Sequence, residues 1–228
     1  MLKRFLAGFA VAVMLASAAV AGPLEDGIAA DRSGNHAEAA NYYLIAAAQG
    51  NAVAQLNLGI MYAKGEGVAQ DNAEALRWYR LAAEQGHAGA QLNIGVFYID
   101  GRGVPQDYAE AAKWYRLAAD QGLAPAQSNL AALYAKGKGV PQDYAKAAQW
   151  SRLAAEQGYA NSQAVLGFIY ANGQGVPQDF VLAHMWSNLA AAQGDANAVK
   201  NRDIVASRMT PDQIAEAQRL AREWKPSP

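Results

Sequence analysis

The sequence predicts an all-α protein in which helical hairpins repeat along the chain and stack into an α-solenoid. The first observation is a fixed period, because successive Gln-Gly pairs lie 36 residues apart and end at Gly50, Gly86, Gly122, Gly158 and Gly194. A constant period in this range is typical of stacked repeat arrays. The second and third observations are a helix-start signal and a column of small residues that recur at the same interval.

The helix-start signal is clearest in the third copy. Asp107 suits the N-cap position and Glu110 the capping-box position, and an apolar stripe follows. Gly122 supplies the left-handed residue that ends this helix, and Pro125 suits the first turn of a second helix, which Gly137 ends. The N-cap and capping-box pair recurs as Asp71 with Glu74 and as Asn35 with Glu38.

The column of small residues contains Gly59, Gly95 and Gly167 inside predicted helices. Glycine within a helix costs about 1 kcal/mol relative to alanine, so its recurrence predicts a close approach of two helices at that point. A hairpin built this way cannot bury its apolar face alone. Neighbouring copies must complete the core, as in other solenoids.

The chain divides into four parts on this reasoning. Residues 1–21 form a predicted signal peptide, residues 22–34 a leading helix, and residues 195–228 a degenerate helix followed by a capping helix that starts at Thr210 and Pro211. The repeat array occupies residues 35–194. Its copies are 35–70, 71–106, 107–142, 143–178 and a degenerate one from 179.

The predicted signal peptide has two basic residues, Lys3 and Arg4, before an uncharged apolar stretch. Ala19 to Ala21 matches the small-residue cleavage pattern, so we expect cleavage before Gly22 and a periplasmic or secreted protein. An uncleaved membrane anchor is the alternative. Cleavage would leave 17 basic and 20 acidic residues, a net charge of −3, and no membrane attachment.

Composition narrows the classes of partner and chemistry. The formal net charge of −1 gives no electrostatic reason to expect nucleic acid or an anionic membrane surface as a partner. The chain has no cysteine, which excludes disulfides, thiolate metal sites and cysteine nucleophiles.

Three strings in this sequence resemble the Sel1-like repeat family, a group related to tetratricopeptide repeats. They run from Ala90 to Tyr98, from Gly101 to Tyr108 and from Ala112 to Ala119, and the resemblance extends over about residues 35–194. The resemblance implies a right-handed superhelix that serves as an adaptor or binding scaffold. For exported bacterial members it implies work in envelope complexes, signalling or polysaccharide assembly.

No pattern in the sequence predicts catalysis. His36, His87 and His184 occupy different columns of the repeat and are not expected to converge on a metal. The Gly-x-Gly turns lack the Gly-Lys-Ser/Thr ending of a phosphate loop, and there is no Ser/His/Asp or paired-acid constellation. We therefore predict no catalytic residues, no cofactor and no metal site.

A partner is expected on the concave face, by analogy with tetratricopeptide geometry. Asparagines in this position suit an extended peptide backbone, because each amide donates and accepts a hydrogen bond, although they also suit a bond to a neighbouring helix. The recurring Trp and Tyr residues are read as core, with a sugar-stacking platform as the alternative. The predicted partner-binding residues are Asn57, Asn93, Asn129, Ile60, Val96, Phe168 and Ile99.

The sequence therefore favours a non-enzymatic, monomeric periplasmic scaffold that binds a protein or peptide in envelope signalling or assembly. A module that binds carbohydrate or peptidoglycan fragments is the alternative. A cell-wall hydrolase is the third hypothesis, which two convergent acids or a perturbed histidine in a pocket would favour.

Overall fold

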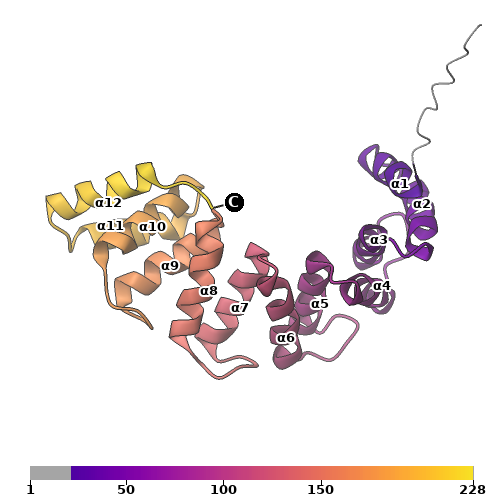
Figure 1. Ribbon diagram of the computed structural model, residues 1–228, viewed down its shortest axis with the longest axis horizontal. Coiled ribbons are helices and arrows are strands. Elements are labelled where there is room, and N and C mark those ends of the chain that lie inside the picture. The colour runs from indigo at the N-terminus through magenta and orange to yellow at the C-terminus, as the bar shows by residue number, and fades with distance from the viewer. Residues whose placement is uncertain (1–21, 228) are drawn as a thin grey trace, which may run out of the picture.

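The computed structural model describes residues 22–227, and the predicted signal peptide lies outside them. The described residues form twelve helices and no strand, which confirms the all-α prediction (Figure 1). The helices are α1 Pro23–Arg32, α2 His36–Ala48, α3 Ala52–Lys64, α4 Asn72–Glu84, α5 Ala88–Asp100, α6 Tyr108–Asp120, α7 Ala124–Lys136, α8 Tyr144–Glu156, α9 Ala160–Asn172, α10 Phe180–Ala192, α11 Ala196–Ala206 and α12 Pro211–Glu223.

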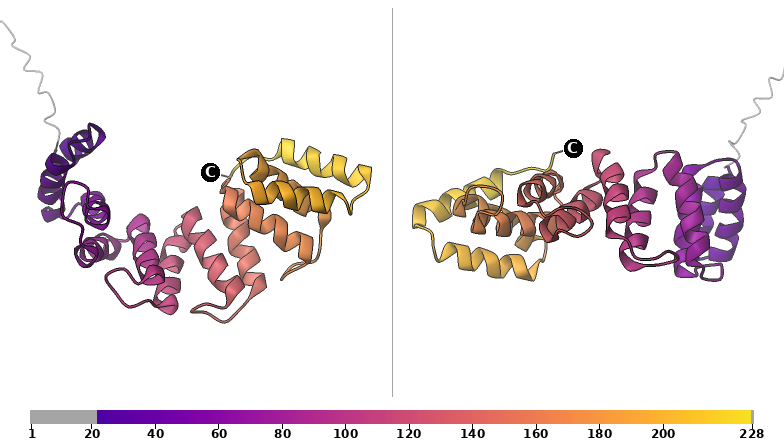
Figure 2. Two further views of the ribbon diagram at one scale, coloured as in Figure 1. Left: turned by 180° about the vertical axis from the view of Figure 1, so that it is seen from behind. Right: turned by 90° about the horizontal axis from the view of Figure 1, so that it is seen from below.

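The helices follow one another in a single curved row. From α2 to α9, each helix packs chiefly against the helices before and after it in the chain. In Figure 1, α3 and α5 lie on the hollow side of the arc and α4 and α6 on its outer side. Figure 2 shows the same row from behind and from below. The predicted α-solenoid, with α12 packed on α10 at its C-terminal end, is confirmed.

The structure confirms part of what the sequence predicts about the N-caps and capping boxes that start the helices. The Asp107 carboxylate accepts bonds from the backbone N–H of Ala109 at 2.8 Å and of Glu110 at 3.0 Å, so it is an N-cap. The reciprocal half of the predicted capping box does not form, because the Asp107 N–H donates to the Tyr98 carbonyl at 2.9 Å. Asn35 makes no side-chain capping bond. The box is complete only where Thr210 and Gln213 start α12.

The glycine column marks the predicted close approach of helices. A Cβ atom on Gly59 would lie 2.4 Å from the ring of Tyr79, and one on Gly95 would lie 2.5 Å from the ring of Tyr115. Both rings are buried against the bare backbone of the preceding helix. In the fourth copy a buried serine, Ser151, takes the place of the tyrosine, and an alanine takes the place of the glycine twenty residues before it.

The Gln-Gly pairs have a role beyond ending a helix. The Gln127 side chain on α7 donates to the Ala119 carbonyl at the end of α6, at 3.3 Å. Its carbonyl oxygen accepts a bond from Gln157 after α8, at 2.9 Å. The same bond joins Gln85 to Gln55, Gln121 to Gln91 and Gln193 to Gln163, and each donor follows its acceptor by 30 residues. This glutamine relay ties each copy to the next.

The C-terminal end of the array contains a buried histidine. His184 on α10 is 4% exposed and occupies the column that holds Ala112 and Ala148 in earlier copies. Burial lowers the pKa of His184, and the positive charge of Arg202 on α11 lowers this pKa further, against the opposing charge of Asp203. The histidine is therefore a neutral group of the C-terminal core.

We expect Gly95→Ala to lower the free energy of unfolding by about 1–2 kcal/mol, because overpacking against Tyr115 outweighs the gain in helix propensity. Gly89→Ala, in the same helix but facing only the flexible ends of side chains, is the matched control. The measurement is urea unfolding followed by circular dichroism. In a Tyr115→Ser background, which imitates the Ala131 and Ser151 pair, the alanine should cost less. An equal cost in both backgrounds would contradict the contact.

We expect the free energy of unfolding to fall as the pH drops below about 6.5, the ordinary pKa of histidine, because His184 takes up its proton more readily in the unfolded chain. One such group contributes a slope of at most about 1.4 kcal/mol per pH unit. His184→Leu, which imitates Leu76 in the same column, should reduce the slope measured by urea unfolding between about pH 7.5 and 5. Equal slopes in the two proteins would rule out this role.

Candidate partner-binding surface

The inner helices each expose one narrow face to the hollow of the arc. On α3 this face consists of Val53, Asn57, Ile60 and Lys64, which are exposed or half-buried while the residues between them are mostly buried. The same positions recur every 36 residues. They are Gly89, Asn93, Val96 and Asp100 on α5, Pro125, Asn129, Ala132 and Lys136 on α7, and Asn161, Val165, Phe168 and Asn172 on α9. We call these sixteen residues the inner surface.

The three predicted asparagines lie on the inner surface, and two of them also bond the preceding helix. The Asn57 side chain hydrogen-bonds the Tyr43 hydroxyl, and that of Asn129 hydrogen-bonds the Tyr115 hydroxyl. Asn201 makes the equivalent bond to a serine, Ser187, at 2.9 Å. These contacts are the interhelical bonds that the sequence left open as an alternative. The half-buried amides therefore support the fold, whether or not they also bind a partner.

The hydroxyl and amide pairing does not recur in every copy. In the fourth copy Ser151 faces the column in which Val165 replaces asparagine, and the Ser151 hydroxyl has no hydrogen-bond partner within residues 22–227. Val165 is 38% exposed and Phe168, one turn further along α9, is 51% exposed. At the column of Asn57, the inner surface is thus an amide on α3, α5 and α7 and apolar on α9.

Two pockets lie between successive inner helices. The pocket between α3 and α5, which we call the α3–α5 pocket, has a volume of about 360 Å³. It brings together the predicted Ile60 and Asn93. Its other lining residues are Ala63, Lys64, Tyr79 and Arg102. Burial raises the pKa of Tyr79 to about 12, against the opposing effect of Arg102, so this phenol is protonated at neutral pH.

The second pocket, between α5 and α7, has a volume of about 220 Å³ and is called the α5–α7 pocket. It brings together the predicted Ile99 and Asn129. Its other lining residues are Tyr108, Tyr115, Ala132, Leu133, Lys136 and Lys138. Burial raises the pKa of Tyr115, and the nearby charge of Asp100 adds to this effect, while the Asn129 bond opposes it. Of the other predicted residues, Val96 lies half-buried between the two pockets in the α5 face, and Phe168 lies apart on α9.

Sequence reasoning missed the basic residues of these pockets. It placed the last inner position six residues after Asn57, in a column that contains Ile99 but is buried at Ala63 and Ala171. The exposed column is one residue later and includes Lys64 and Lys136. A strict helical stripe, with a position seven residues after Asn57, would have found it. Arg102 and Lys138 come from loops after the helices, for which helical periodicity gives no signal.

The recurring aromatic residues are mainly core, as predicted. Trp78, Tyr134, Tyr170 and Trp186 are buried, and Trp114 and Trp150 are partly buried against the core. Trp186 packs edge-on against Trp224 after α12, with ring centroids 6.0 Å apart. Neighbouring side chains therefore cover much of the surface of these recurring aromatic rings.

The described residues contain few features of a catalytic site. Residues 22–227 include no group of three His, Asp or Glu side chains arranged to hold a metal ion. Asp26 and Glu38 line a polar pocket between α1 and α2, at the N-terminal end of the array, so a pair of acids in a pocket, one of the two alternative features that would favour a hydrolase, is present there. The histidine with a lowered pKa, His184, is buried at the opposite end.

No helix within residues 22–227 combines the length and the apolar character needed to cross a bilayer.

Comparisons with known proteins identify the repeat. The family model described as Sel1 repeat matches residues 16–51, 52–87, 88–123, 124–159 and 160–195. The last four matched copies begin at the inner helices α3, α5, α7 and α9. The matched copies therefore have the predicted 36-residue period but differ in phase from copies that start at residue 35. No curated protein matches the sequence.

Solved structures give the same result. A Sel1 repeat protein from Oxalobacter formigenes is 33% identical, with a TM-score of 0.76 over 87% of this chain and 84% of that one. A protective antigen from uropathogenic Escherichia coli is 28% identical, with a TM-score of 0.51 over 89% of this chain and 60% of that one. A Sel1 repeat protein from Klebsiella pneumoniae is 22% identical, with a TM-score of 0.50 over 79% and 89%, and shows the fold alone.

Sel1 repeat proteins generally mediate protein–protein interactions, and their scaffold is typically non-catalytic. Five consecutive copies of the repeat account for most of the sequence, and the resemblance seen in its motifs is confirmed. This protein belongs to the Sel1 repeat family.

Proposed function

We propose that this protein is a non-enzymatic scaffold of the bacterial cell envelope that holds an extended segment of a protein partner on its inner surface. The observation that carries the proposal is the row of pockets along that surface, each lined by apolar side chains and an asparagine amide. Apolar walls with a few fixed polar groups are typical of sites that bind peptides and small ligands.

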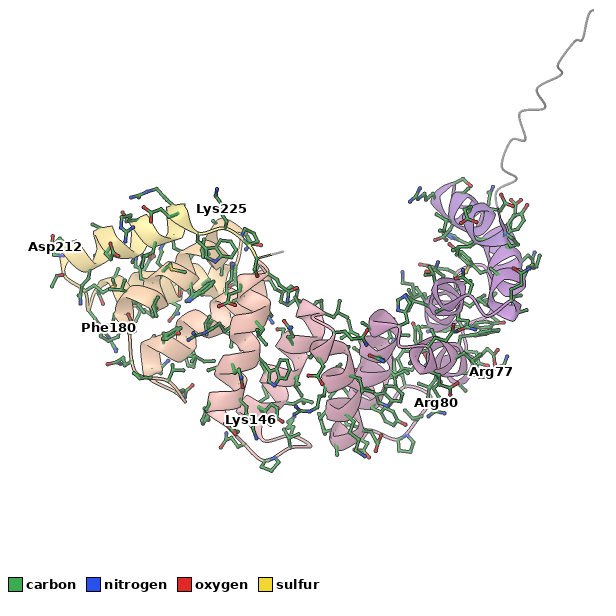
Figure 3. All side chains as sticks on the ribbon, in the orientation of Figure 1. Arg77, Arg80, Lys146, Phe180, Asp212 and Lys225 are labelled. Carbon is green, nitrogen blue, oxygen red and sulfur yellow. The ribbon has the colours of Figure 1, made fainter. Side chains whose placement is uncertain are left out.

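The outer side of the arc has a repeating column of polar side chains. Arg77 and Arg80 point away from the hollow on α4, as Figure 3 shows. Lys113 and Gln149 occupy the same column as Arg77 in later copies and are exposed. The inner surface instead presents Ile60, Val96 and Phe168 between its polar groups. The outer helices also expose Leu81, Leu117 and Leu153 and line a pocket of about 410 Å³. The inner side is therefore favoured by the asparagine amides that line its pockets, and not by apolar exposure alone.

A glycan ligand is supported less well. Sugar rings stack on exposed aromatic faces, and the recurring Trp and Tyr faces here are largely covered by neighbouring helices. Phe168, at 51% exposure, and Tyr144, at 37%, are exposed, but Phe168 has no aromatic partner on the inner surface of α9. We therefore favour a protein segment as the partner.

Site-specific photo-crosslinking in cells tests the location of binding. A photoreactive amino acid placed at Ala132 or Phe168 should yield discrete adducts with a protein, while the same amino acid at Lys113 or Gln149 should yield few. All four side chains are exposed, so reactivity with solvent is matched. Equal labelling from both sides would sink the inner-surface proposal. Adducts removed by a glycan-degrading enzyme would transfer support to the carbohydrate-binding alternative.

Export is a separate part of the proposal and rests on the leader sequence. We expect the full chain, expressed in a Gram-negative host, to fractionate with the periplasm and to have Gly22 as its first residue by N-terminal sequencing. Charged substitutions in the apolar stretch, such as Phe9→Asp with Val13→Asp, should leave an unprocessed chain in the cytoplasm. Full recovery of the uncleaved wild type in the membrane fraction would instead indicate an anchor.

A further inference from the structure

The α5–α7 pocket differs from the α3–α5 pocket in its electrostatics. In the α3–α5 pocket, Arg102 lies 3.6 Å from Asp100, and Lys64 lies 3.5 Å from Glu66, so both cations have acidic neighbours. Lys136 and Lys138 in the α5–α7 pocket form no ion pair within residues 22–227. The second pocket therefore presents two ammonium groups whose charge no carboxylate of the described chain neutralises directly.

One of the two ammonium groups has a defined position. The Lys138 Nζ lies 3.5 Å from the Tyr108 hydroxyl and 4.8 Å from the centroid of the Tyr108 ring. A cation held over an aromatic face loses less conformational entropy when it binds an anion than one on a free side chain does. Asp100, which faces Tyr115 at the margin of the pocket, is engaged by Arg102. The local excess of charge is positive, although the whole chain has a net charge of −1.

Neutral groups complete the pocket. The Asn129 amide and the Tyr115 hydroxyl lie at its base, and the raised pKa of Tyr115 keeps that hydroxyl protonated. Ile99, Ala132 and Leu133 form an apolar wall. A carboxylate accepts hydrogen bonds from ammonium and amide groups, and the methylene groups of a glutamate suit an apolar wall.

The volume limits the size of the ligand. Pockets for drug-sized ligands measure about 300–1,000 Å³, and this one measures about 220 Å³. It suits a single side chain better than a whole small molecule. The α3–α5 pocket, one copy earlier, shares the tyrosine and asparagine columns, so neighbouring side chains of one extended segment have two places to bind.

We propose that the α5–α7 pocket is a specificity subsite for a glutamate or aspartate side chain in an extended segment of the partner protein. Lys136 and Lys138 bind the carboxylate, and the wall of Ile99, Ala132 and Leu133 packs on the aliphatic part of the side chain. This proposal rests on the proposed function, since it names the chemistry of the segment that the inner surface holds. The α3–α5 pocket, whose cations are already paired, selects less strongly for charge.

The test uses the full chain, purified after expression with its own leader, as bait for a phage-displayed library of random 12-residue peptides. We expect the selected peptides to be enriched in Glu and Asp. For one selected peptide, Kd is then measured by fluorescence anisotropy with wild type and with Lys136→Gln combined with Lys138→Gln. The double variant should bind about tenfold more weakly, because charge-assisted hydrogen bonds are lost.

Matched controls separate this subsite from general electrostatics. Lys113→Gln combined with Lys146→Gln removes the same charge from exposed positions of outer helices and should leave Kd unchanged. Replacing the critical glutamate of the peptide by glutamine should weaken binding to wild type but not to the Lys136 and Lys138 variant. Circular dichroism checks that both variants retain the helical signal.

The outcomes distinguish the two proposals. Selected peptides without an acidic excess, or equal losses in the two charge variants, would overturn the acidic subsite. In that case, the proposal that the inner surface binds the partner would still stand if Phe168→Ser raised the Kd of the selected peptides. Failure to select any peptide, or peptides unaffected by every inner-surface substitution, would overturn both the subsite and the proposed function.

Discussion

The structure depends on how closely successive helices approach at the glycine column. Where Gly59 and Gly95 expose bare backbone, the rings of Tyr79 and Tyr115 lie directly against the preceding helix. Each tyrosine also lines an inner pocket, together with the asparagine of the next inner helix. The same contact thus sets the packing distance within the core and the depth of the surface on which a partner is proposed to bind.

A second set of bonds keeps the copies in register. Each buried glutamine of an inner helix bonds the end of the outer helix before it and accepts a bond from the glutamine that ends the outer helix after it. Buried amides are costly unless they are paired, so the relay stabilises one relative placement of the copies over others. The array reaches its C-terminal end at α10, where Gln193 makes the last such bond and α12 covers the neighbouring core.

The architecture could be predicted from the sequence, but several residues of the candidate binding surface could not. Period, caps and apolar stripes are local signals, and they correctly placed α1, α7 and α12 and the close approach at Gly95. The reciprocal capping bond at Asp107 failed because a carbonyl from the preceding helix, that of Tyr98, competes for the same N–H. Lys138 joins a pocket through loop geometry, and Asn129 bonds Tyr115 through tertiary packing. Residue spacing alone predicts neither the position of Lys138 in the pocket nor the bond between Asn129 and Tyr115.

The glutamine relay also bears on how such a protein can change length. In each glutamine–glutamine bond of the relay, the donor follows its acceptor by 30 residues, while the copies repeat every 36 residues. Within the array, deleting or duplicating 36 residues or a multiple of 36 therefore rejoins a donor to an equivalent acceptor, wherever the cut falls. A change of another length that shifts one helix along its axis leaves buried amides without partners. Such an array evolves in whole steps, and each step adds or removes one inner face together with the pocket beside it.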